Sequence, residues 1–248
     1  MIFPRPIAHR GLHDAKRGVV ENSLAAARDA IAGGYAIECD VQLSADGEAM
    51  VFHDDDLDRL TTATGPLSRV TAAALSRLAL RGTTETIPTL QDLLSAVAGR
   101  SLLVIELKSR FDGDLRLARR VAELAAQYNG PLAIKSFDPD PIAYLRAEGQ
   151  ALGIGHIPLG IVARASYDLE GGPGLSPAQR AEVTHFLHFA RTRPQFLSFN
   201  VEDYPHTAPG LFRHALKLPV TAWTVRTPEM ALAAADWADA IVFEGFSP

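Results

Sequence analysis

Residues 36–53 read AIECDVQLSADGEAMVFH, and this stretch sets the pattern from which the rest of the chain can be interpreted. Two β-rich runs, Ala36–Val41 and Ala49–His53, flank the dipeptide Asp46-Gly47, which strongly favours a tight hairpin turn. No helix fits in so short a connection. We therefore expect these two strands to pair antiparallel.

Outside this hairpin, short apolar runs alternate with longer helical patterns. The further strand candidates are Pro6–His9, Leu102–Leu107, Leu132–Ser136, Leu159–Val162, Phe196–Phe199, Val220–Val225 and Ala240–Phe243. The helix candidates are residues 22–32, Thr89–Ala98, Asp114–Tyr128, Pro141–Glu148, Pro177–Arg191, Gly210–Leu216 and Pro228–Trp237. Such alternation implies parallel strands joined by crossovers, and about eight units in 248 residues predict an α/β fold, a closed (β/α)8 TIM barrel with an extra strand in the hairpin.

Two further segments complete this pattern. Residues 57–85 are predicted as a polar excursion between barrel strands, with a modest helix near Thr71–Leu80, and residues 171–174 as an exposed loop. An open, doubly wound sheet is the alternative fold. That fold usually carries a glycine-rich phosphate turn after the first strand, where this chain has His9-Arg10-Gly11.

Composition excludes several classes of protein. The chain has 24 Lys and Arg against 29 Asp and Glu, a formal charge of −5, which disfavours binding to nucleic acids or anionic membranes. A single cysteine, Cys39, excludes an internal disulfide and fits a reducing compartment. The N-terminus lacks the apolar core of a signal peptide, and no run approaches the ~20 apolar residues of a membrane span. We expect one soluble cytoplasmic domain over residues 1–248, of open oligomeric state.

Ionisable residues gather at the predicted strand ends, where barrel enzymes carry their sites. Glu38 and Asp40 lie two residues apart and share a face, and with Glu106 they would form a cluster of three carboxylates. Two like charges about 4 Å apart cost roughly 4 kcal/mol at an effective dielectric of ~20, so the cluster needs protonation or a cation. Oxygen ligands favour Mg²⁺, Ca²⁺ or Mn²⁺ over Zn²⁺. Alternatively, the acids simply pair with Arg10 and Lys108.

Two histidines at strand ends, His9 and His53, form a natural acid–base pair because imidazole titrates near neutral pH. His9 and His13 have the spacing of a helical zinc pair, but they follow a strand, and Arg10 stands where a glutamate would be needed. His185 and His188 are interpreted as surface or packing residues. Arg10 and Lys108, in a net-acidic protein, suit a single phosphate group.

The motifs that carry this chemistry occur in a fixed order. They are His9-Arg10-Gly11, Glu21-Asn22-Ser23, Glu38-Cys39-Asp40-Val41, Asp46-Gly47, His53-Asp54 with Leu57 and Arg59, Ile87-Pro88-Thr89-Leu90, Glu106-Leu107-Lys108, Ser136-Phe137 and Trp223-Thr224-Val225. This set resembles the signature of the glycerophosphodiester phosphodiesterases, from the first strand to the last quarter of the chain. The resemblance implies a (β/α)8 barrel of the phospholipase-C-like phosphodiesterase type.

The resemblance also implies an activity: metal-dependent hydrolysis of small glycerophosphodiesters, such as glycerophosphocholine or glycerophosphoethanolamine, to glycerol 3-phosphate and an alcohol. One divalent cation, Mg²⁺ or Ca²⁺ with Mn²⁺ as a further candidate, would be the cofactor. The roles carried over by position are catalytic His9 and His53, metal ligands Glu38, Asp40 and Glu106, and substrate contacts Arg10, Lys108 and Trp223.

The C-terminal part departs from the family's pattern. The family often ends its last strand with Thr-Asp before a proline, whereas this chain has Phe243-Glu244-Gly245-Phe246. Arg226 stands where an asparagine is common, and the excursion at residues 57–85 is short for the family's insertion. Because of these departures, the resemblance does not indicate which alcohol the substrate carries.

Two other functions compete with this reading. A phosphodiesterase of the same fold could act on lysophospholipids or phosphoinositides, with an apolar approach supplied by loop residues Phe111, Phe137, Tyr167 and Phe246. A non-catalytic phosphate-binding barrel belongs to another class. It predicts that a metal ligand or a catalytic histidine is missing, whereas the three acidic ligands and both histidines are present in this chain.

Overall fold

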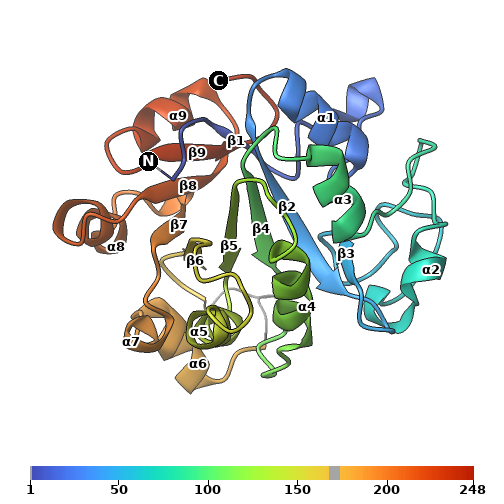
Figure 1. Cartoon of the computed structure of the whole chain (residues 1–248). Helices are drawn as coiled ribbons and strands as arrows, with labels where there is room; N and C mark the ends of the chain where they lie inside the picture. The colour runs from blue at the N-terminus through green and yellow to red at the C-terminus, as the bar shows by residue number, and fades with distance from the viewer. Residues whose placement is uncertain (1, 168–173) are drawn as a thin grey trace.

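The barrel closes because its first and second strands pair with each other. A computed structural model of the chain describes residues 2–167 and 174–248, and its strand order is β1, β9, β8, β7, β6, β5, β4, β2, with β1 pairing back to β2 (Figure 1). The eight parallel strands are β1 (Ile7–Ala8), β2 (Ala36–Leu43), β4 (Leu103–Leu107), β5 (Leu132–Ser136), β6 (Leu159–Ala163), β7 (Phe196–Asn200), β8 (Val220–Val225) and β9 (Ala240–Phe243). The predicted (β/α)8 barrel is confirmed.

The predicted hairpin is confirmed as well. Strand β3 (Ala49–Val51) runs antiparallel to β2 at the edge of the barrel, with Val41 opposite Val51. Gly47 has a φ of 87°, a left-handed conformation that a glycine adopts without steric cost. The hairpin therefore adds a ninth strand without opening the barrel.

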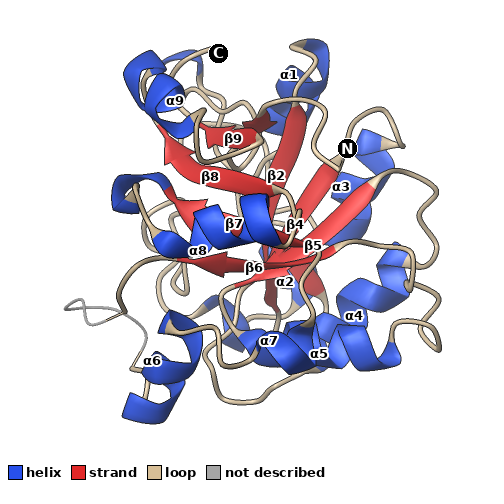
Figure 2. Ribbon diagram, turned by 90° about the vertical axis from the view of Figure 1, so that its left-hand side faces the viewer, coloured by secondary structure: helices blue, strands red, loops and turns tan. Residues whose placement is uncertain are grey.

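Helices surround the ring of strands (Figure 2). They are α1 (Leu24–Ala32), α2 (Ala72–Leu75), α3 (Leu90–Val97), α4 (Arg116–Ala125), α5 (Pro139–Glu148), α6 (Pro177–Thr184), α7 (Phe189–Thr192), α8 (Thr207–Gly210) and α9 (Pro228–Ala234). Short turns η1 (Ala15–Arg17), η2 (Leu67–Arg69), η3 (Val201–Asp203) and η4 (Leu211–Ala215) supplement them. Helix starts follow polar caps: the Ser23 hydroxyl accepts from the Ala26 amide, and Thr89 forms a capping box with Asp92.

Two of the predicted helices differ from the structure in where they break or begin. The single helix expected at Pro177–Arg191 is interrupted between α6 and α7, where Phe186 adopts a φ of 54° and its ring packs against the core. The helix expected to begin at Gly210 begins at Thr207, because the His206 ring accepts from the Ala208 amide. Of the loop predicted at residues 171–174, residues 171–173 lie outside the described residues.

The excursion at residues 57–85 has a small apolar core of its own, although its sequence is largely polar. The helix expected at Thr71–Leu80 is limited to α2. The apolar side chains that pack together there are Met50, Phe52, Leu57, Leu67, Leu75, Leu80 and Ile87. This cluster anchors the segment that follows His53 to the outer side of the hairpin.

The inside of the barrel is apolar at one end and polar at the other. Phe3 and Phe196 pack edge to face with ring centroids 4.9 Å apart, together with Ile7, Val104 and Val242. The larger core lies between the strands and the surrounding helices. None of the helices in the described residues combines the length and apolar character that crossing a bilayer requires.

Candidate active site

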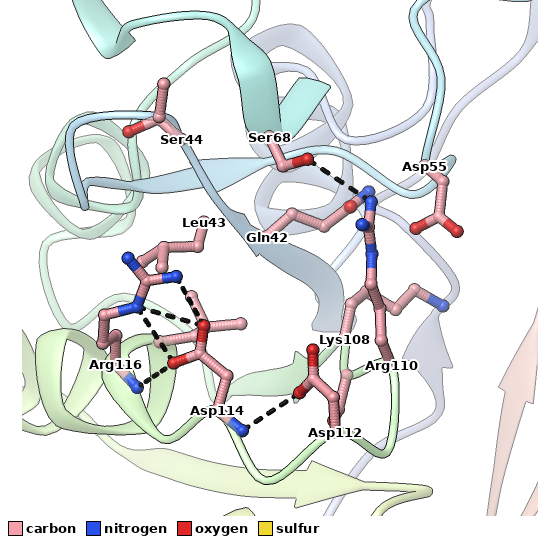
Figure 3. Close-up of a pocket in the computed structure, with 13 residues that line it drawn as sticks. Gln42, Leu43, Ser44, Asp55, Ser68, Lys108, Arg110, Asp112, Asp114 and Arg116 are labelled. Carbon is pink, nitrogen blue, oxygen red and sulfur yellow. Dashed lines mark hydrogen bonds and ion pairs between the residues drawn. The ribbon is translucent and has the colours of Figure 1, made fainter. Parts of the chain in front are cut away.

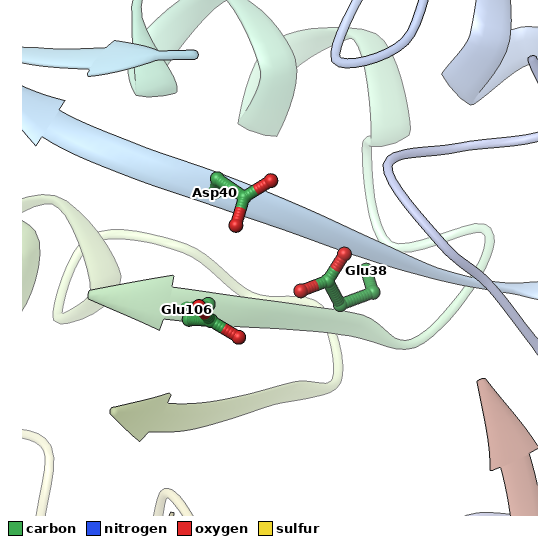
Figure 4. Close-up of side chains that lie close together, drawn as sticks. All are labelled: Glu38, Asp40 and Glu106. Atoms are coloured by element: carbon green, nitrogen blue, oxygen red, sulfur yellow. The ribbon is translucent and has the colours of Figure 1, made fainter. Parts of the chain in front are cut away.

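Strand register brings three acidic side chains together inside the barrel. Asp40 on β2 pairs with Glu106 on β4, and Glu38 lies two residues earlier on the same face of β2. One carboxylate oxygen from each side chain lies within 4.8 Å of the other two, and all three residues are buried (Figure 4). The predicted acidic cluster is confirmed, and Cys39 points away from it into the outer core. We call these three residues the acidic triad.

Two lysines neutralise the acidic triad. Lys108 Nζ lies 3.1 Å from Asp40 Oδ1 and 3.0 Å from Glu106 Oε1. Lys135 Nζ lies 3.1 Å from both Glu38 Oε1 and Glu106 Oε2. Sequence reasoning did not pair Lys135 with the triad. The β4–β5 register, which places Lys135 beside Glu106, was the missing information.

Asp40 and Glu106 are ionised because the neighbouring cationic side chains outweigh the effect of burial. Burial raises the pKa of Asp40, but Lys108 and His53 hold it well below its usual range. Burial likewise raises the pKa of Glu106, yet Lys108 and Lys135 lower it to about 2. The pKa of Lys108 is raised by Asp40 and Glu106 against the effect of burial, so this lysine stays protonated. The pairing with Arg10 and Lys108 that was the alternative to a metal ion is therefore present, with both residues on Asp40 and Lys108 also on Glu106.

Arg10 and Asn22 hold the triad from the loop after β1. Arg10 Nε lies 3.3 Å from Asp40 Oδ2, and the Arg10 backbone amide donates to Glu38 Oε2 at 3.0 Å. The Asn22 amide donates to Asp40 Oδ2 at 3.0 Å, and its Oδ1 accepts from the Asp40 backbone amide at 3.1 Å. The motif containing Asn22 therefore fixes the orientation of Asp40.

Gly11 explains why this loop can approach helix α1 so closely. Its φ is 79°, and a Cβ placed on it would lie 2.8 Å from Ala26 Cβ. No side chain fits in that space, so a glycine after Arg10 is required for the path that brings Arg10 to the triad.

His9 is anchored by a carboxylate that sequence reasoning did not assign to the site. Its Nδ1 lies 2.5 Å from Glu244 Oε2, and Glu244 Oε1 accepts from Arg226 Nε at 2.8 Å. His13 Nε2 lies 3.7 Å from Glu244 Oε2. The His13 and His9 imidazoles and the Arg226 guanidinium hold the pKa of the Glu244 carboxyl well below its ordinary value. Glu244 and Arg226 both belong to the C-terminal departures from the family's pattern, and they form one ion pair.

His53 has a matching arrangement. Its Nδ1 lies 2.8 Å from Asp54 Oδ1, and Asp54 receives two hydrogen bonds from Arg59, at 2.5 and 2.9 Å. Burial raises the pKa of Asp54, but Arg59 and His53 lower it to about 2. Arg59 also binds Glu21, which in turn accepts from Arg10 at 2.6 Å. Each predicted histidine is therefore backed by a carboxylate, and each carboxylate is held by an arginine.

Trp223 lies among aromatic side chains at the ends of other strands. Its Nε1 donates to the Ser198 carbonyl at 3.0 Å, and its ring packs edge to face on Phe137 with centroids 5.3 Å apart. The Arg164 guanidinium lies 5.7 Å from the Trp223 ring centroid and 5.9 Å from that of Phe137. These contacts form an apolar surface with one cation over it.

Three of the four aromatic loop residues singled out in the sequence come together. Phe111 and Phe137 pack with Tyr167, whereas Phe246 packs on Phe243 with ring centroids 5.8 Å apart. The aromatic surface therefore comprises Phe111, Phe137, Tyr167 and Trp223, without Phe246.

The acidic triad fits one divalent cation. Oxygen ligands lie about 2.0–2.6 Å from Mg²⁺ or Ca²⁺, so two oxygens on one ion are separated by at most roughly 4–5 Å. The separations of up to 4.8 Å among the triad oxygens meet this condition. All three ligands are carboxylates, the donors that these hard cations prefer.

Solved structures of phosphodiesterases share the closed (β/α)8 barrel of this chain. A phosphodiesterase from Oleispira antarctica, solved with sn-glycerol-3-phosphate, matches 98% of this chain and 93% of its own with a TM-score of 0.77 and 24% identity. A glycerophosphodiester phosphodiesterase from Thermotoga maritima matches 96% of this chain and 92% of its own, with a TM-score of 0.71 and 25% identity.

The chain belongs to the glycerophosphoryl diester phosphodiesterase family, whose model matches residues 9–245. A glycerophosphodiester phosphodiesterase from Caldanaerobacter subterraneus is 38% identical over 111 residues, covering 42% of this chain and 44% of the relative. Glycerophosphodiester phosphodiesterase 1 from Bos taurus is 33% identical over 156 residues, covering 58% of this chain and 46% of the relative. The matched part thus spans about half the length of these curated relatives.

Proposed function

We propose that the protein hydrolyses glycerophosphodiesters to sn-glycerol 3-phosphate and a free alcohol. Membership of the family supports this reaction. The observation that carries it is the pair of histidines, each with Nδ1 on a carboxylate, near a buried acidic triad. Both imidazoles lie close enough to Asp40 to lower the pKa of its carboxyl.

The acidic triad would hold the cofactor. A divalent cation on Glu38, Asp40 and Glu106, Mg²⁺ or Ca²⁺ with Mn²⁺ as a further candidate, supplies neutralisation of phosphate charge and a lower pKa for a nearby hydroxyl. The chain's own cations add to this. Arg10 and Lys108 are only partly exposed, so the phosphate meets positive charge in a site with little water to screen it.

The histidines would move the protons. One imidazole removes the proton from the glycerol 2-hydroxyl, whose oxygen attacks phosphorus, while the other protonates the oxygen of the leaving alcohol. A 1,2-cyclic glycerophosphate forms, and water then opens it with the two imidazoles in exchanged roles. Glu244 and Asp54, which are ionised and therefore accept only, keep a proton on each Nδ1 and leave each Nε2 for transfer.

The direct test is a panel of glycerophosphodiesters assayed for glycerol 3-phosphate, with chelator and with added Mg²⁺, Ca²⁺ or Mn²⁺. The expected result is release of glycerol 3-phosphate that chelator abolishes and at least one cation restores. Undiminished turnover after exhaustive chelation would overturn the metal requirement. Absence of glycerol 3-phosphate from every substrate and cation would overturn the function.

A second candidate substrate is favoured by the aromatic surface of Phe111, Phe137, Tyr167 and Trp223. An acyl chain on the glycerol could lie against such rings, which would extend the same reaction to lysophospholipids. Lysophosphatidylethanolamine, assayed for lysophosphatidic acid beside glycerophosphoethanolamine, separates the two. A kcat/KM for the lipid at or above that of the water-soluble diester would favour the second candidate.

A further inference from the structure

A polar pocket opens beside the acidic triad. Its volume is about 300 Å³, and it lies between the end of β2, the loop after β4 and the turn at Ser68 (Figure 3). We infer that this pocket is the subsite for the leaving alcohol, and that it selects a small head group carrying a primary ammonium. This inference rests on the proposed function and deepens it. We call the cavity the head-group pocket.

Several residues that line the head-group pocket follow residues of the proposed active site on the same strands and loops. Gln42 follows Asp40 by two residues on β2, and Lys108 follows Glu106 by two residues at the end of β4, so each pair shares a face. Asp55 follows His53 by two residues. Lys108 belongs to both places, because its ammonium contacts the triad while its side chain lines the pocket. A phosphate at the triad would therefore have an ester oxygen directed towards this cavity.

The charged side chains that line the pocket differ in whether they have an ion-pair partner. Arg116 pairs with Asp114 at 2.6 Å on one side, as Figure 3 shows, and Lys108 is engaged by the triad. Arg110 donates a hydrogen bond to Ser68 at 3.4 Å on the other side.

Two carboxylates remain in the lining. Within the described part of the chain, neither Asp55 nor Asp112 has a cationic side chain within ion-pair distance, although the Asp112 carboxylate accepts from the Asp114 backbone amide. Over the whole lining the charges balance, with Lys108, Arg110 and Arg116 against three aspartates. Because Lys108 is engaged by the triad and Arg116 by Asp114, the Asp55 and Asp112 carboxylates are the ones left to accept hydrogen bonds from a cationic head group.

The composition of the lining indicates which type of ammonium head group the pocket binds. The apolar side chains are Leu43, Ala45 and Leu117, and among the described residues no aromatic ring lines the cavity. A trimethylammonium group cannot donate hydrogen bonds and is recognised mainly by aromatic faces, whereas a primary ammonium donates three. With carboxylates and no rings, the pocket suits an ethanolamine-type alcohol better than choline. Its polar lining and small volume exclude an acyl chain.

The experiment compares three glycerophosphodiesters that differ only in the alcohol: glycerophosphoethanolamine, glycerophosphocholine and glycerophosphoglycerol. We expect the highest kcat/KM for glycerophosphoethanolamine. The double variant Asp55→Asn/Asp112→Asn should raise KM for this substrate by about three- to tenfold, the combined effect of two exposed ion pairs, and change KM for glycerophosphoglycerol by less than twofold. The double variant Glu229→Gln/Asp236→Asn, at two exposed residues outside the pocket, is the charge-matched control.

The outcomes are distinguishable. A kcat/KM for glycerophosphocholine at or above that for glycerophosphoethanolamine would overturn the inference and leave the proposed function standing. An equal loss on all three substrates in the double variant would do the same. No glycerol 3-phosphate from any of the three, with wild-type protein and each divalent cation, would overturn the proposed function and this inference with it. Thermal melting of the variants verifies that they fold.

Discussion

Glu244 Oε2 lies 2.5 Å from His9 Nδ1, which joins the last strand of the barrel to the first. The register explains the contact: Ala8 on β1 pairs with Phe243 on β9, so His9 and Glu244 leave neighbouring strands at the same level. Because the carboxylate is ionised, it fixes the tautomer with hydrogen on Nδ1. Closure of the barrel is therefore what orients this imidazole.

Replacing Glu244 by glutamine should lower kcat by about 10- to 100-fold with little change in KM. The glutamine amide can donate to Nδ1 and so favour the wrong tautomer of His9. Glu244→Asp should retain more activity than Glu244→Gln because it keeps the charge. Steady-state kinetics on a glycerophosphodiester measures both. Glu229→Gln, on the surface of α9, is the matched control, and an unchanged kcat in Glu244→Gln would refute the anchoring role.

His9→Ala and His53→Ala should each lower kcat by about 10²- to 10⁴-fold, the usual contribution of a general acid or base. The double variant should lose much less than the product of the single losses, because the two groups act in one step. His156→Ala, an exposed histidine, is the control for folding and handling. Near-normal turnover in both single variants would remove these residues from the mechanism.

Lys135→Met should destabilise the protein by about 3–5 kcal/mol in chelator, because Glu38 and Glu106 then lose their buried cationic partner. Mg²⁺ or Ca²⁺ should restore part of this loss by binding the folded state. Urea unfolding with chelator and with each cation measures the effect. Lys16→Met, an exposed lysine, should change stability little. A Lys135→Met protein as stable as wild type in chelator would contradict the neutralising role.

His188 should make folding stability depend on pH. It is 1% exposed, and burial lowers its pKa from 6.5 to about 4. Between these values the unfolded chain binds a proton that the folded chain does not. The free energy of unfolding should therefore fall as pH decreases from about 6.5 to 4, by up to about 1.4 kcal/mol per pH unit.

His188→Gln removes this titration and keeps a polar group near Thr192, whose hydroxyl lies 3.2 Å from His188 Nδ1. The variant should show a flatter stability profile than wild type in urea unfolding at pH 7, 5.5 and 4.5. His156→Gln, which is exposed, should keep the wild-type slope. Equal slopes in all three proteins would show that His188 does not carry the effect.

Hydrophobic periodicity, together with turn- and cap-forming residues, was sufficient to predict the barrel. Alternating strand and helix patterns predicted eight parallel strands, and Asp46-Gly47 predicted the extra antiparallel strand. The face shared by Glu38 and Asp40 also followed from the two-residue repeat of a strand, which is a local property. The break at Phe186 could not be predicted, because a left-handed residue in the middle of a helical pattern is stabilised by packing rather than by propensity.

What the sequence by itself determined was therefore the fold class, the face on which the acids lie and the candidate histidines. Only the tertiary structure decided the partners of these groups: Lys135 for the acidic triad, Glu244 for His9, and the pocket beside Lys108. The physical reason is distance along the chain. Lys135 reaches the triad through strand register, and Glu244 reaches His9, 235 residues away, only when the barrel closes. No local pattern encodes such contacts, because they depend on how whole strands align.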